Sequence, residues 1–421
     1  MKIKMVGMGA AGNKACVNAI EKEVITLNQG LLLNSTMRDI PQDYKDIAVQ
    51  YSNARGGAGK ERAIAKRLCL ESIQDGTLDC LDKLIEDDDD LVILVASTEG
   101  GTGSGTIPVL AKYYSKVIGI PVHCFVFTGF EEDSRGLQNT IEFFQEMEED
   151  YTIQAISNKK FLDSNNNNKL KAEKAANDEF VRRISILIGK DVQESEQNID
   201  ETDLFKVSTT PGYMTIGESK LDRIKNAEQF NKIVADIIDN STSLDVTDKT
   251  IKRLAIFLNV SDRTSEIIDH NYTIFKDKLG VPYELFSHVQ YNDNQPESVS
   301  FIASGLNMPL DEVKDIYNKY KKEADKINTK KDNFFDFMGG IQKEEKKKEL
   351  FKEMFNMEEV IQQPKKEVSE IVKDKQNFVN DFGVSFRRKK AEPTVINDAP
   401  TSDGERNKVK LTREDYLKNN F

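Results

Sequence analysis

The chain has 421 residues, enough for two or three domains, and its 38% hydrophobic and 31% charged residues are typical of a soluble globular protein. Its net charge of −12 argues against a surface that wraps nucleic acid. The four scattered cysteines, without a C-x-x-C pair, exclude a disulfide scaffold and a zinc ribbon, and three distant histidines make a histidine-rich metal site unexpected. Since no run approaches the ~20 apolar residues of a membrane-spanning helix, and residues 1–7 contain no signal-peptide core, we expect a cytoplasmic protein.

The charge is unevenly distributed along the chain. Residues 330–421 contain 20 Lys and Arg against 18 Asp and Glu, a net charge of +2, so residues 1–329 carry −14. Beyond Thr329 apolar residues become sparse and charge runs such as 343–348 appear, a composition typical of a segment without a packed core. We therefore expect an acidic folded body and a mostly disordered tail, with one helix at 343–356.

Strands and helices are predicted to alternate through the first part of the chain. Apolar runs predict strands at 2–6, 30–33, 47–51, 91–96 and 121–128. The run at 91–96 has no polar alternation, as expected of a strand buried on both faces. Helices are predicted at 13–23 and from Lys60, and glycine loops follow three of the strands. This order predicts an α/β fold with a doubly wound parallel sheet and a ligand crevice at the carboxyl ends of its strands.

A predicted helix at 171–189, ending at Gly189, and a polar stretch at 191–203 separate this part from a second, smaller α/β unit. Its predicted strands are 214–217, 254–260 and 299–305, and its predicted helices are 226–239, 262–278 and 309–328. The predicted division is a nucleotide-binding domain at 1–170, a central helix with its loop at 171–204, a C-terminal α/β domain at 205–329 and the tail at 330–421.

The most informative motif is the loop Gly100-Gly101-Thr102-Gly103-Ser104-Gly105, between a buried strand and a helix. Glycines let backbone N–H groups approach phosphate oxygens, the two hydroxyls add donors, and the helix N-terminus favours negative charge. A flexible Gly/Ser turn would have the same composition, but a loop in this position is rarely only a turn. We therefore predict phosphate binding at 100–105.

Two further glycine loops are expected at the same edge of the sheet. Gly7-x-Gly9-x-x-Gly12 alone fits a dinucleotide-binding enzyme, but that class needs an acid at the end of the second strand, where this chain has Asn34. The loop at 56–60 is not a Walker A motif, because Ala54 and Glu61 stand where that motif requires glycine and a hydroxyl. Three loops together indicate a triphosphate held mainly by backbone groups.

The order of these motifs resembles the tubulin/FtsZ superfamily of GTPases over roughly residues 1–310: G-x-G-x-x-G-N at 7–13, Asn34, the Gly-Ala-Gly loop, then G-G-T-G-S-G. The resemblance implies GTP and GDP as ligands, with Mg²⁺, and no dedicated metal-ligand set in the chain. The implied contacts in and beside the phosphate loops are Gly9, Ala10, Ala11, Asn13, Asn34, Gly57, Ala58, Gly59, Gly100, Gly101, Thr102, Gly103 and Ser104.

The resemblance also implies contacts to the rest of the nucleotide. Glu131 and Arg135, four residues apart after the fifth strand, match the family's ribose contacts, and Asn158 follows the sixth strand. Asn177 matches the family's Ala-Ala-Asn-Asp element and is implied to contact guanine. Taken alone, Asn177 would be interpreted as an ordinary polar helix residue.

Residues 198–203 (Asn-Ile-Asp-Glu-Thr-Asp) have two interpretations. By themselves they are a helix N-cap with acidic residues in the first turn. They also match the family's N-x-D-x-x-D synergy loop, which implies that Asp200 and Asp203, with Asn198, complete GTP hydrolysis in the next subunit of a filament. The resemblance thus implies a GTPase activated by head-to-tail polymerisation, an open-ended form of assembly.

Within the superfamily, three features are similar to the plasmid- and phage-borne TubZ branch: the loop 57–62, the long helix 309–328 and the insertion 165–168. That resemblance implies DNA segregation in a bacterial or phage-infected cell, with the tail engaging a DNA-binding adaptor and DNA contacted indirectly. Two alternatives remain: an FtsZ-type division GTPase and a metabolic nucleotide-binding enzyme. The cluster 381–390, ending in Arg387-Arg388-Lys389-Lys390, is either a partner-docking peptide or a chance group of charges in a solvated tail.

Overall fold

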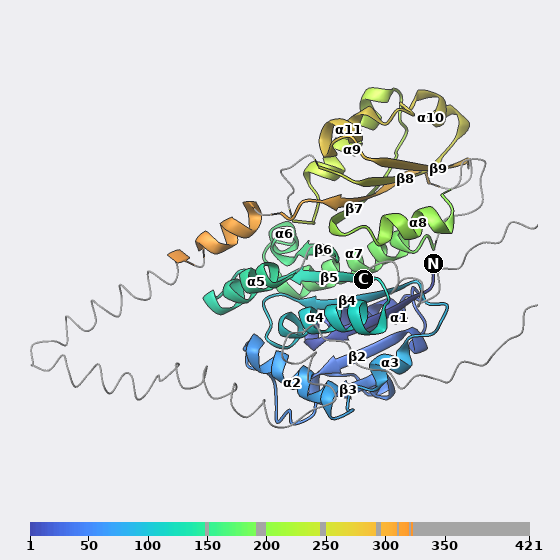
Figure 1. The fold of residues 1–421 in the computed structure, drawn as a ribbon. Coiled ribbons are helices and arrows are strands. Elements are labelled where there is room, and N and C mark those ends of the chain that lie inside the picture. Colours follow the sequence, from blue (N-terminus) through green and yellow to red (C-terminus); the bar gives the residue numbers. More distant parts are fainter. Residues whose placement is uncertain are drawn as a thin grey trace, which may run out of the picture.

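The computed structural model describes residues 1–147, 151–190, 199–244, 250–291, 296–309, 311–319 and 321–322, shown as coloured ribbon in Figure 1. Their strands form one ten-stranded sheet, in the order β3-β2-β1-β4-β5-β6-β7-β10-β8-β9. The predicted tail at 330–421, including its helix at 343–356, lies outside the described residues.

The first six strands are all parallel, as the alternating pattern predicted. They are β1 (Ile3–Met8), β2 (Gly30–Asn34), β3 (Ala48–Gln50), β4 (Leu91–Ser97), β5 (Val122–Thr128) and β6 (Thr152–Ser157). The helices of this part are α1 (Gly9–Glu21), α2 (Arg62–Gln74), α3 (Cys80–Leu84), α4 (Thr102–Lys112) and α5 (Ser134–Glu146). Helix α4 continues into a π-helical segment at Tyr113–Ile118.

The second half adds four strands to the same sheet, and these strands lie in the upper part of Figure 1. It also contributes further helices. The helices are α6 (Asn158–Ser164), α7 (Lys169–Leu187), α8 (Glu201–Ser208), α9 (Ala227–Asp239), α10 (Asp262–Ile267) and α11 (Thr273–Leu279). The strands are β7 (Gly212–Lys220), β8 (Arg253–Val260), β9 (Glu284–Tyr291) and β10 (Ser298–Leu306). Only two register pairs, Thr152 with Gly212 and Ile153 with Tyr213, join β7 to β6, so the two halves share a narrow strand contact.

Two predictions for the second half are wrong in detail. The helix predicted at 262–278 is two helices, because Asp269 accepts hydrogen bonds from the backbone N–H groups of Asn271 (2.9 Å) and Thr273 (3.2 Å) and turns the chain between them. Tyr272 in this turn has a positive φ of 53°. Strand β9 was not predicted. The final helix is described at 311–319 and 321–322, and the backbone N–H of Val313 donates to the carbonyl of Pro309 at 3.1 Å, in agreement with the start predicted at 309.

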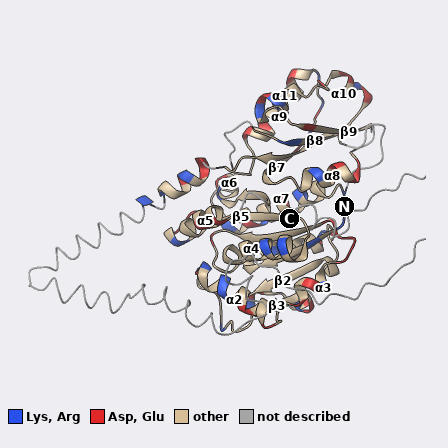
Figure 2. Cartoon of the chain, in the orientation of Figure 1, with Lys and Arg blue, Asp and Glu red and all other residues tan. Residues whose placement is uncertain are grey.

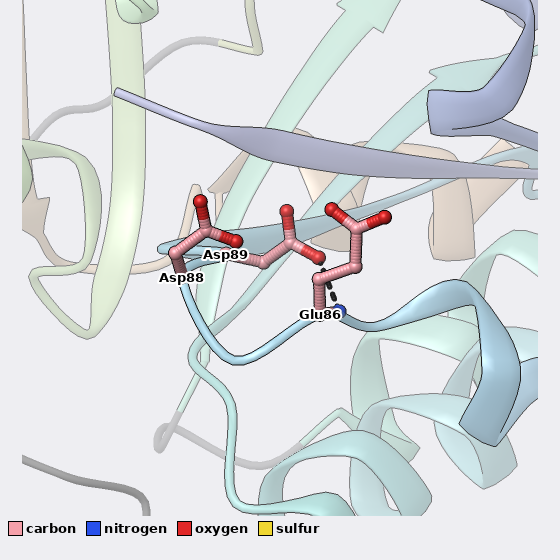
Figure 3. A group of neighbouring side chains, drawn as sticks. All are labelled: Glu86, Asp88 and Asp89. Carbon is pink, nitrogen blue, oxygen red and sulfur yellow. Dashed lines mark hydrogen bonds between the residues drawn. The ribbon is translucent and has the colours of Figure 1, made fainter.

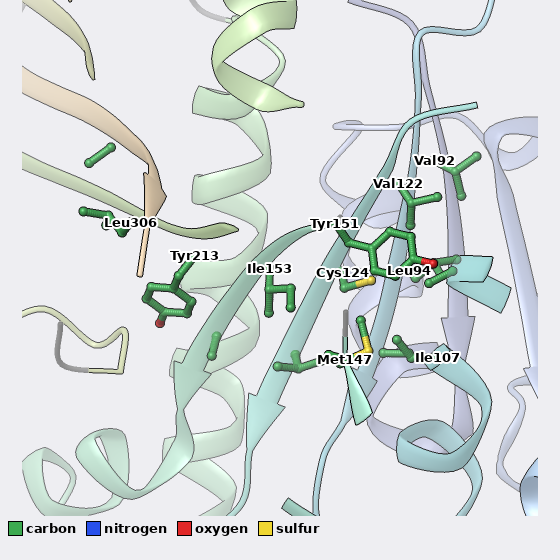
Figure 4. Close-up of a cluster of buried hydrophobic side chains, with 14 of the residues drawn as sticks. Val92, Leu94, Ile107, Val122, Cys124, Met147, Tyr151, Ile153, Tyr213 and Leu306 are labelled. Carbon is green, nitrogen blue, oxygen red and sulfur yellow. The ribbon is translucent and has the colours of Figure 1, made fainter. Parts of the chain in front are cut away.

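The core lies on both faces of the sheet. Strand β4 is buried from Leu91 to Ala96: Val92 and Leu94 belong to one hydrophobic cluster and Ile93 and Val95 to another on the opposite face. Figure 4 shows the first cluster extending from β4 to Tyr213 of β7, so apolar packing also connects the two halves. In Figure 2 the charged residues lie mainly on helices and loops, and the strands are largely uncharged.

Helix α7 connects the halves through a buried cation. The guanidinium of Arg183, whose side chain is 2% exposed, donates to Glu179 Oε1 at 2.7 Å, Ser243 Oγ at 2.8 Å and Thr242 Oγ1 at 2.7 Å. Removing one partner of a buried, fully hydrogen-bonded pair leaves the others desolvated. The contact therefore ties the central helix to the loop that follows α9.

We expect Arg183→Met to lower the free energy of unfolding by about 3 kcal/mol. The matched control is Arg182→Met, since the neighbouring Arg182 pairs with Glu179 and Glu218 but has a 43% exposed side chain, and its loss should cost less than about 1 kcal/mol. Urea unfolding followed by circular dichroism measures both. Equal destabilisation by the two variants would contradict the coupling assigned to Arg183.

The buried His123 on β5 predicts acid sensitivity. Burial lowers the pKa of its imidazole from 6.5 to about 4, so the folded chain holds it neutral where the unfolded chain would protonate it. Because the unfolded state binds more protons between these values, stability should fall by roughly 3 kcal/mol as the pH drops from 6.5 to 4. In urea titrations across this pH range, the free energy of unfolding of His123→Phe should fall less than that of the wild type. An equal fall in both proteins would argue against this assignment.

Candidate nucleotide site

Three glycine loops meet at the carboxyl edge of β1 and β4, packed backbone against backbone. A Cβ on Gly12 would lie 2.0 Å from the carbonyl oxygen of Val95, and a Cβ on Gly103 would lie 2.8 Å from that of Met8. A Cβ on Gly101 would lie 2.7 Å from the backbone nitrogen of Glu61. Only glycine permits these contacts, so the loops predicted from the sequence are brought together as one structure.

Other glycines in the same loops are not explained by packing. A Cβ on Gly56, Gly57 or Gly100 would meet no atom within 4 Å among the described residues. These three lack a positive φ as well, so neither crowding nor backbone conformation requires glycine there. Open backbone beside a helix N-terminus is what a phosphate group needs in order to approach N–H donors.

A hollow of about 200 Å³ lies beside these loops. It is lined by Ala10, Ala11, Lys14, Ser97, Glu99, Phe127, Gly129, Phe130, Asn158, Glu173, Ala176 and Asn177. A second, more open hollow of about 400 Å³ between α1 and α7 shares Glu173 and Asn177 with it. Together they have the volume of an ordinary small-molecule site, ~300–1,000 Å³.

Four of the predicted contacts line the first hollow: Ala10, Ala11, Asn158 and Asn177. Ala10 and Ala11 lie in the first turn of α1, where backbone N–H groups have no partner within the helix. Asn177 donates from its side chain to the carbonyl of Glu173 at 2.9 Å, and its own carbonyl accepts from Asn18 at 3.2 Å. Asn18, on the inner face of α1, was not predicted as part of the site.

Asn13 and Asn34 are buried beneath the loops. Asn13 donates to the carbonyl of Leu33 at 3.2 Å, and Asn34 Oδ1 accepts from the backbone N–H of Ser35 at 2.9 Å. Asn13 Oδ1 and Asn34 Nδ2 have no hydrogen-bond partner within the described ranges. Both side chains thus hold the end of β2 and keep an unsatisfied polar atom next to the loops.

The loop hydroxyls already have partners in this structure. Ser104 Oγ donates to the carbonyl of Gly100, and Thr102 Oγ1 lies 3.1 Å from Ser35 Oγ. Ser104 is fully buried. The prediction that both hydroxyls donate to phosphate would require these bonds to be shared or exchanged, whereas the backbone of the loop is available as it stands.

Glu131 and Arg135 do not line either hollow. The Glu131 carboxylate pairs with Lys319 of the C-terminal helix, and Arg135 pairs with Glu61 and donates to the carbonyl of Lys60 at 3.3 Å. Glu131 precedes α5 with a positive φ of 58°, so the two residues are not on one helical turn. Their predicted ribose contacts stay predictions, and in this structure both residues brace the loops around the site.

Glu99 is a member of the site that sequence reasoning missed. Its carboxylate lies in the hollow, accepts a hydrogen bond from the backbone N–H of Glu131 at 2.8 Å, and has a pKa raised by burial. It directly precedes Gly100, so its place in the motif was the available signal.

The predicted catalytic carboxylates belong to α8, which bonds to the C-terminal end of α7. Asp200 caps α8, its Oδ1 accepting from the N–H of Asp203 at 2.8 Å; Asn198 lies outside the described residues. Ser208 at the end of α8 donates to the carbonyl of Leu187, which is ten residues beyond Asn177 on α7, about 15 Å along the helix axis. Asp200 and Asp203 are not brought to the hollow of their own chain.

A second acidic group, Glu86, Asp88 and Asp89, stands before β4, away from the hollow (Figure 3). The ammonium groups of Lys2 and Lys4 lie among its carboxylates, with Lys2 Nζ 2.7 Å from Asp88 Oδ1 and Lys4 Nζ 3.7 Å from Asp89 Oδ2. Two lysines already neutralise most of its charge. The cluster fastens the start of β1 to the turn before β4.

Comparison with known proteins agrees with this geometry. The family model "Tubulin/FtsZ family, GTPase domain" matches residues 2–166. Residues 2–166 of the chain are thus a GTPase domain of the tubulin/FtsZ family.

Two curated relatives come from archaea. The chain is 26% identical over 250 residues to cell division protein FtsZ 1 of Methanocaldococcus jannaschii, covering 58% of this chain and 66% of that protein. It is 25% identical over 239 residues to the tubulin-like protein CetZ1 of Haloferax volcanii, covering 52% and 59% respectively. The matched part thus spans less than two thirds of each of these relatives.

Solved structures share the fold over a longer range. TubZ of Clostridium botulinum phage c-st has a TM-score of 0.59 at 18% identity, covering 77% of this chain and 99% of that one. A GTPγS-form protofilament of Bacillus thuringiensis TubZ has a TM-score of 0.65 at 16% identity, covering 79% and 94%. Among the described residues, no helix is both long and apolar enough to cross a membrane.

Proposed function

We propose that this chain binds and hydrolyses GTP and polymerises head to tail, with hydrolysis completed by Asp200 and Asp203 of the neighbouring subunit. One observation carries the proposal: the hollow lies against the first half of α7, whereas the two carboxylates belong to α8, which bonds to Leu187 at the C-terminal end of α7, so the two are separate in one chain. Stacking subunits along the axis of α7 would place the carboxylates of one chain over the phosphate loops of the next chain. The contact joins two different surfaces, so it generates an open filament.

In this assembly the backbone N–H groups at 9–11 and 100–105 hold the phosphates, and the carboxylate of Asp203 polarises the attacking water. Asp203 is partly exposed and lies 3.6 Å from Lys206 Nζ on the same face of α8, so its carboxylate is available to a neighbour. Asp200 keeps the first turn of α8 in place. Asn177 and Asn158 contact the nucleoside from the hollow's other wall.

We propose DNA segregation of a plasmid or phage as the cellular role, with residues 330–421 engaging a DNA-binding adaptor. The tail's near-neutral charge and its basic cluster at Arg387–Lys390 support it, against a body that carries −14. Cell division is the second candidate, because one curated relative is named a cell division protein. The two roles differ in partner: a DNA-bound adaptor or a membrane tether.

Co-sedimentation separates the two roles. Filaments of the full chain and of a chain ending at residue 329 are pelleted with GTP in the presence of purified candidate adaptor bound to its DNA site, or of tether-coated vesicles. We expect DNA in the pellet only with the full chain and the adaptor. Recovery of vesicles in place of DNA would favour division, and equal recovery by both chains would show that the tail is not the docking segment.

A further inference from the structure

The charges around the hollow leave one carboxylate without a cation. Lys14 and Glu173 in its lining pair with each other, and three further ion pairs join side chains of the neighbouring loops: Lys60 with Asp133, Arg135 with Glu61, and Lys319 with Glu131. Glu99, which also lines the hollow, forms no ion pair within the part of the chain that the structure describes. The hollow is therefore acidic where the proposed function places a triphosphate.

The position of Glu99 is built into the loops. Gly129 and Gly136 leave space for its side chain, since a Cβ on Gly129 would lie 1.9 Å from Glu99 Oε2 and a Cβ on Gly136 would lie 3.1 Å from its Cδ. The backbone N–H of Glu131 donates to Oε1, and the side chain of Asn139 donates to the carbonyl of Glu99 at 3.0 Å. The carboxylate is thus held at the wall of the hollow rather than directed into solvent.

A free nucleotide would be repelled by this group. Phosphate oxygens and an unpaired carboxylate in a half-enclosed site repel each other more strongly than they would in water. A divalent cation removes the repulsion, and carboxylate and phosphate oxygens are the ligands that Mg²⁺ prefers. The residues present therefore fit a nucleotide that arrives with its metal.

We propose that Glu99 makes the site selective for the Mg²⁺ complex of the nucleotide, by offering a carboxylate oxygen to the metal directly or through a bound water. The proposal rests on the GTP site proposed above. It assigns to this chain a binding residue inside its own phosphate loop, separate from Asp200 and Asp203 at the filament contact.

The test compares nucleotide affinity with and without metal. A fluorescent GTPγS analogue is titrated into wild type, Glu99→Gln and the control Glu132→Gln, in Mg²⁺ and in EDTA; Glu132 pairs with Lys169 at the surface. We expect Mg²⁺ to tighten binding about 30-fold or more in the wild type and the control, but only about threefold in Glu99→Gln, mainly because metal-free binding becomes tighter. Mn²⁺ affinity of the nucleotide complex, measured by electron paramagnetic resonance, should fall about tenfold in the same variant.

Each outcome decides a separate question. If Mg²⁺ tightens nucleotide binding by the same factor in Glu99→Gln as in the wild type, the role of Glu99 is overturned. A carboxyl group that is protonated in the site would give this same result. Absence of nucleotide binding in the wild type under both conditions would overturn the proposed function instead. Should Glu99→Gln fail to fold, Glu99→Asp keeps the charge on a shorter side chain: retention of most of the Mg²⁺ dependence supports the proposal, and its loss with normal metal-free affinity contradicts it.

Discussion

Asp203→Asn is expected to slow GTP turnover by about 100-fold or more while GTP affinity stays within about twofold. The carboxylate belongs to α8, which bonds to the C-terminal end of α7, whereas the nucleotide hollow lies against residues 173–177 of α7, so its removal should leave the binding loops intact and act at the proposed contact between subunits. Filaments should still form, and they should persist because the bound GTP is not consumed. Steady-state phosphate release, nucleotide titration and sedimentation of one preparation measure the three quantities.

The control variants separate charge from helix capping. Asp200→Asn keeps a side chain that can cap α8 and so tests the charge alone, whereas Asp200→Ala also removes the cap and should cost about 1 kcal/mol of stability. Glu201→Gln changes an exposed acid of the same turn and should leave turnover unchanged. Normal turnover in Asp203→Asn, or loss of its GTP binding, would show that the carboxylate has been given the wrong role.

The second large effect is expected at Gly12. Its Cβ would lie 2.0 Å from the carbonyl oxygen of Val95, and this neighbour is backbone of a fully buried strand that cannot move aside. Gly12→Ala should therefore push α1 away from β4, lower the free energy of unfolding by about 3 kcal/mol and abolish GTP binding.

Gly57→Ala is the matched control, because a Cβ there meets nothing within 4 Å among the described residues. Its stability should change by less than about 1 kcal/mol, while GTP affinity falls by roughly tenfold if the phosphates approach this backbone. Chemical unfolding and nucleotide titration of both variants give the comparison. A stable Gly12→Ala chain that binds GTP would contradict the packing described here.

The parts of the fold that were predictable are those with strong local signals. The apolar run at 91–96 predicted a strand buried on both faces, and the glycine loops predicted where three backbone segments meet. Strand β9 gave no such signal, because it alternates poorly and its Tyr291 is 49% exposed; it exists through its parallel pairing with β8. The break in the helix predicted at 262–278 depends on one side-chain turn at Asp269, which periodicity cannot indicate.

The site was predictable in its loops and less so in its side chains. Among the contacts that the resemblance implied, Ala10, Ala11, Asn158 and Asn177 line the hollow, and their contact with a nucleotide stays a prediction. Glu131 and Arg135 pair instead with Lys319 and Glu61, charges from distant parts of the chain that no motif connects to them. Whether Glu99 has a basic partner also depends on tertiary contacts, so a motif in the sequence could not indicate that its carboxylate lacks an ion pair among the described residues.

The central claim is that hydrolysis requires contact between subunits, and one experiment tests it most directly. GTP hydrolysis per subunit and light scattering are recorded together over a series of protein concentrations. Hydrolysis per subunit should be very low at low concentration and rise at the concentration where scattering appears, because the site is completed only in the filament. A rate per subunit that is independent of concentration, with no scattering in GTP, would contradict the account.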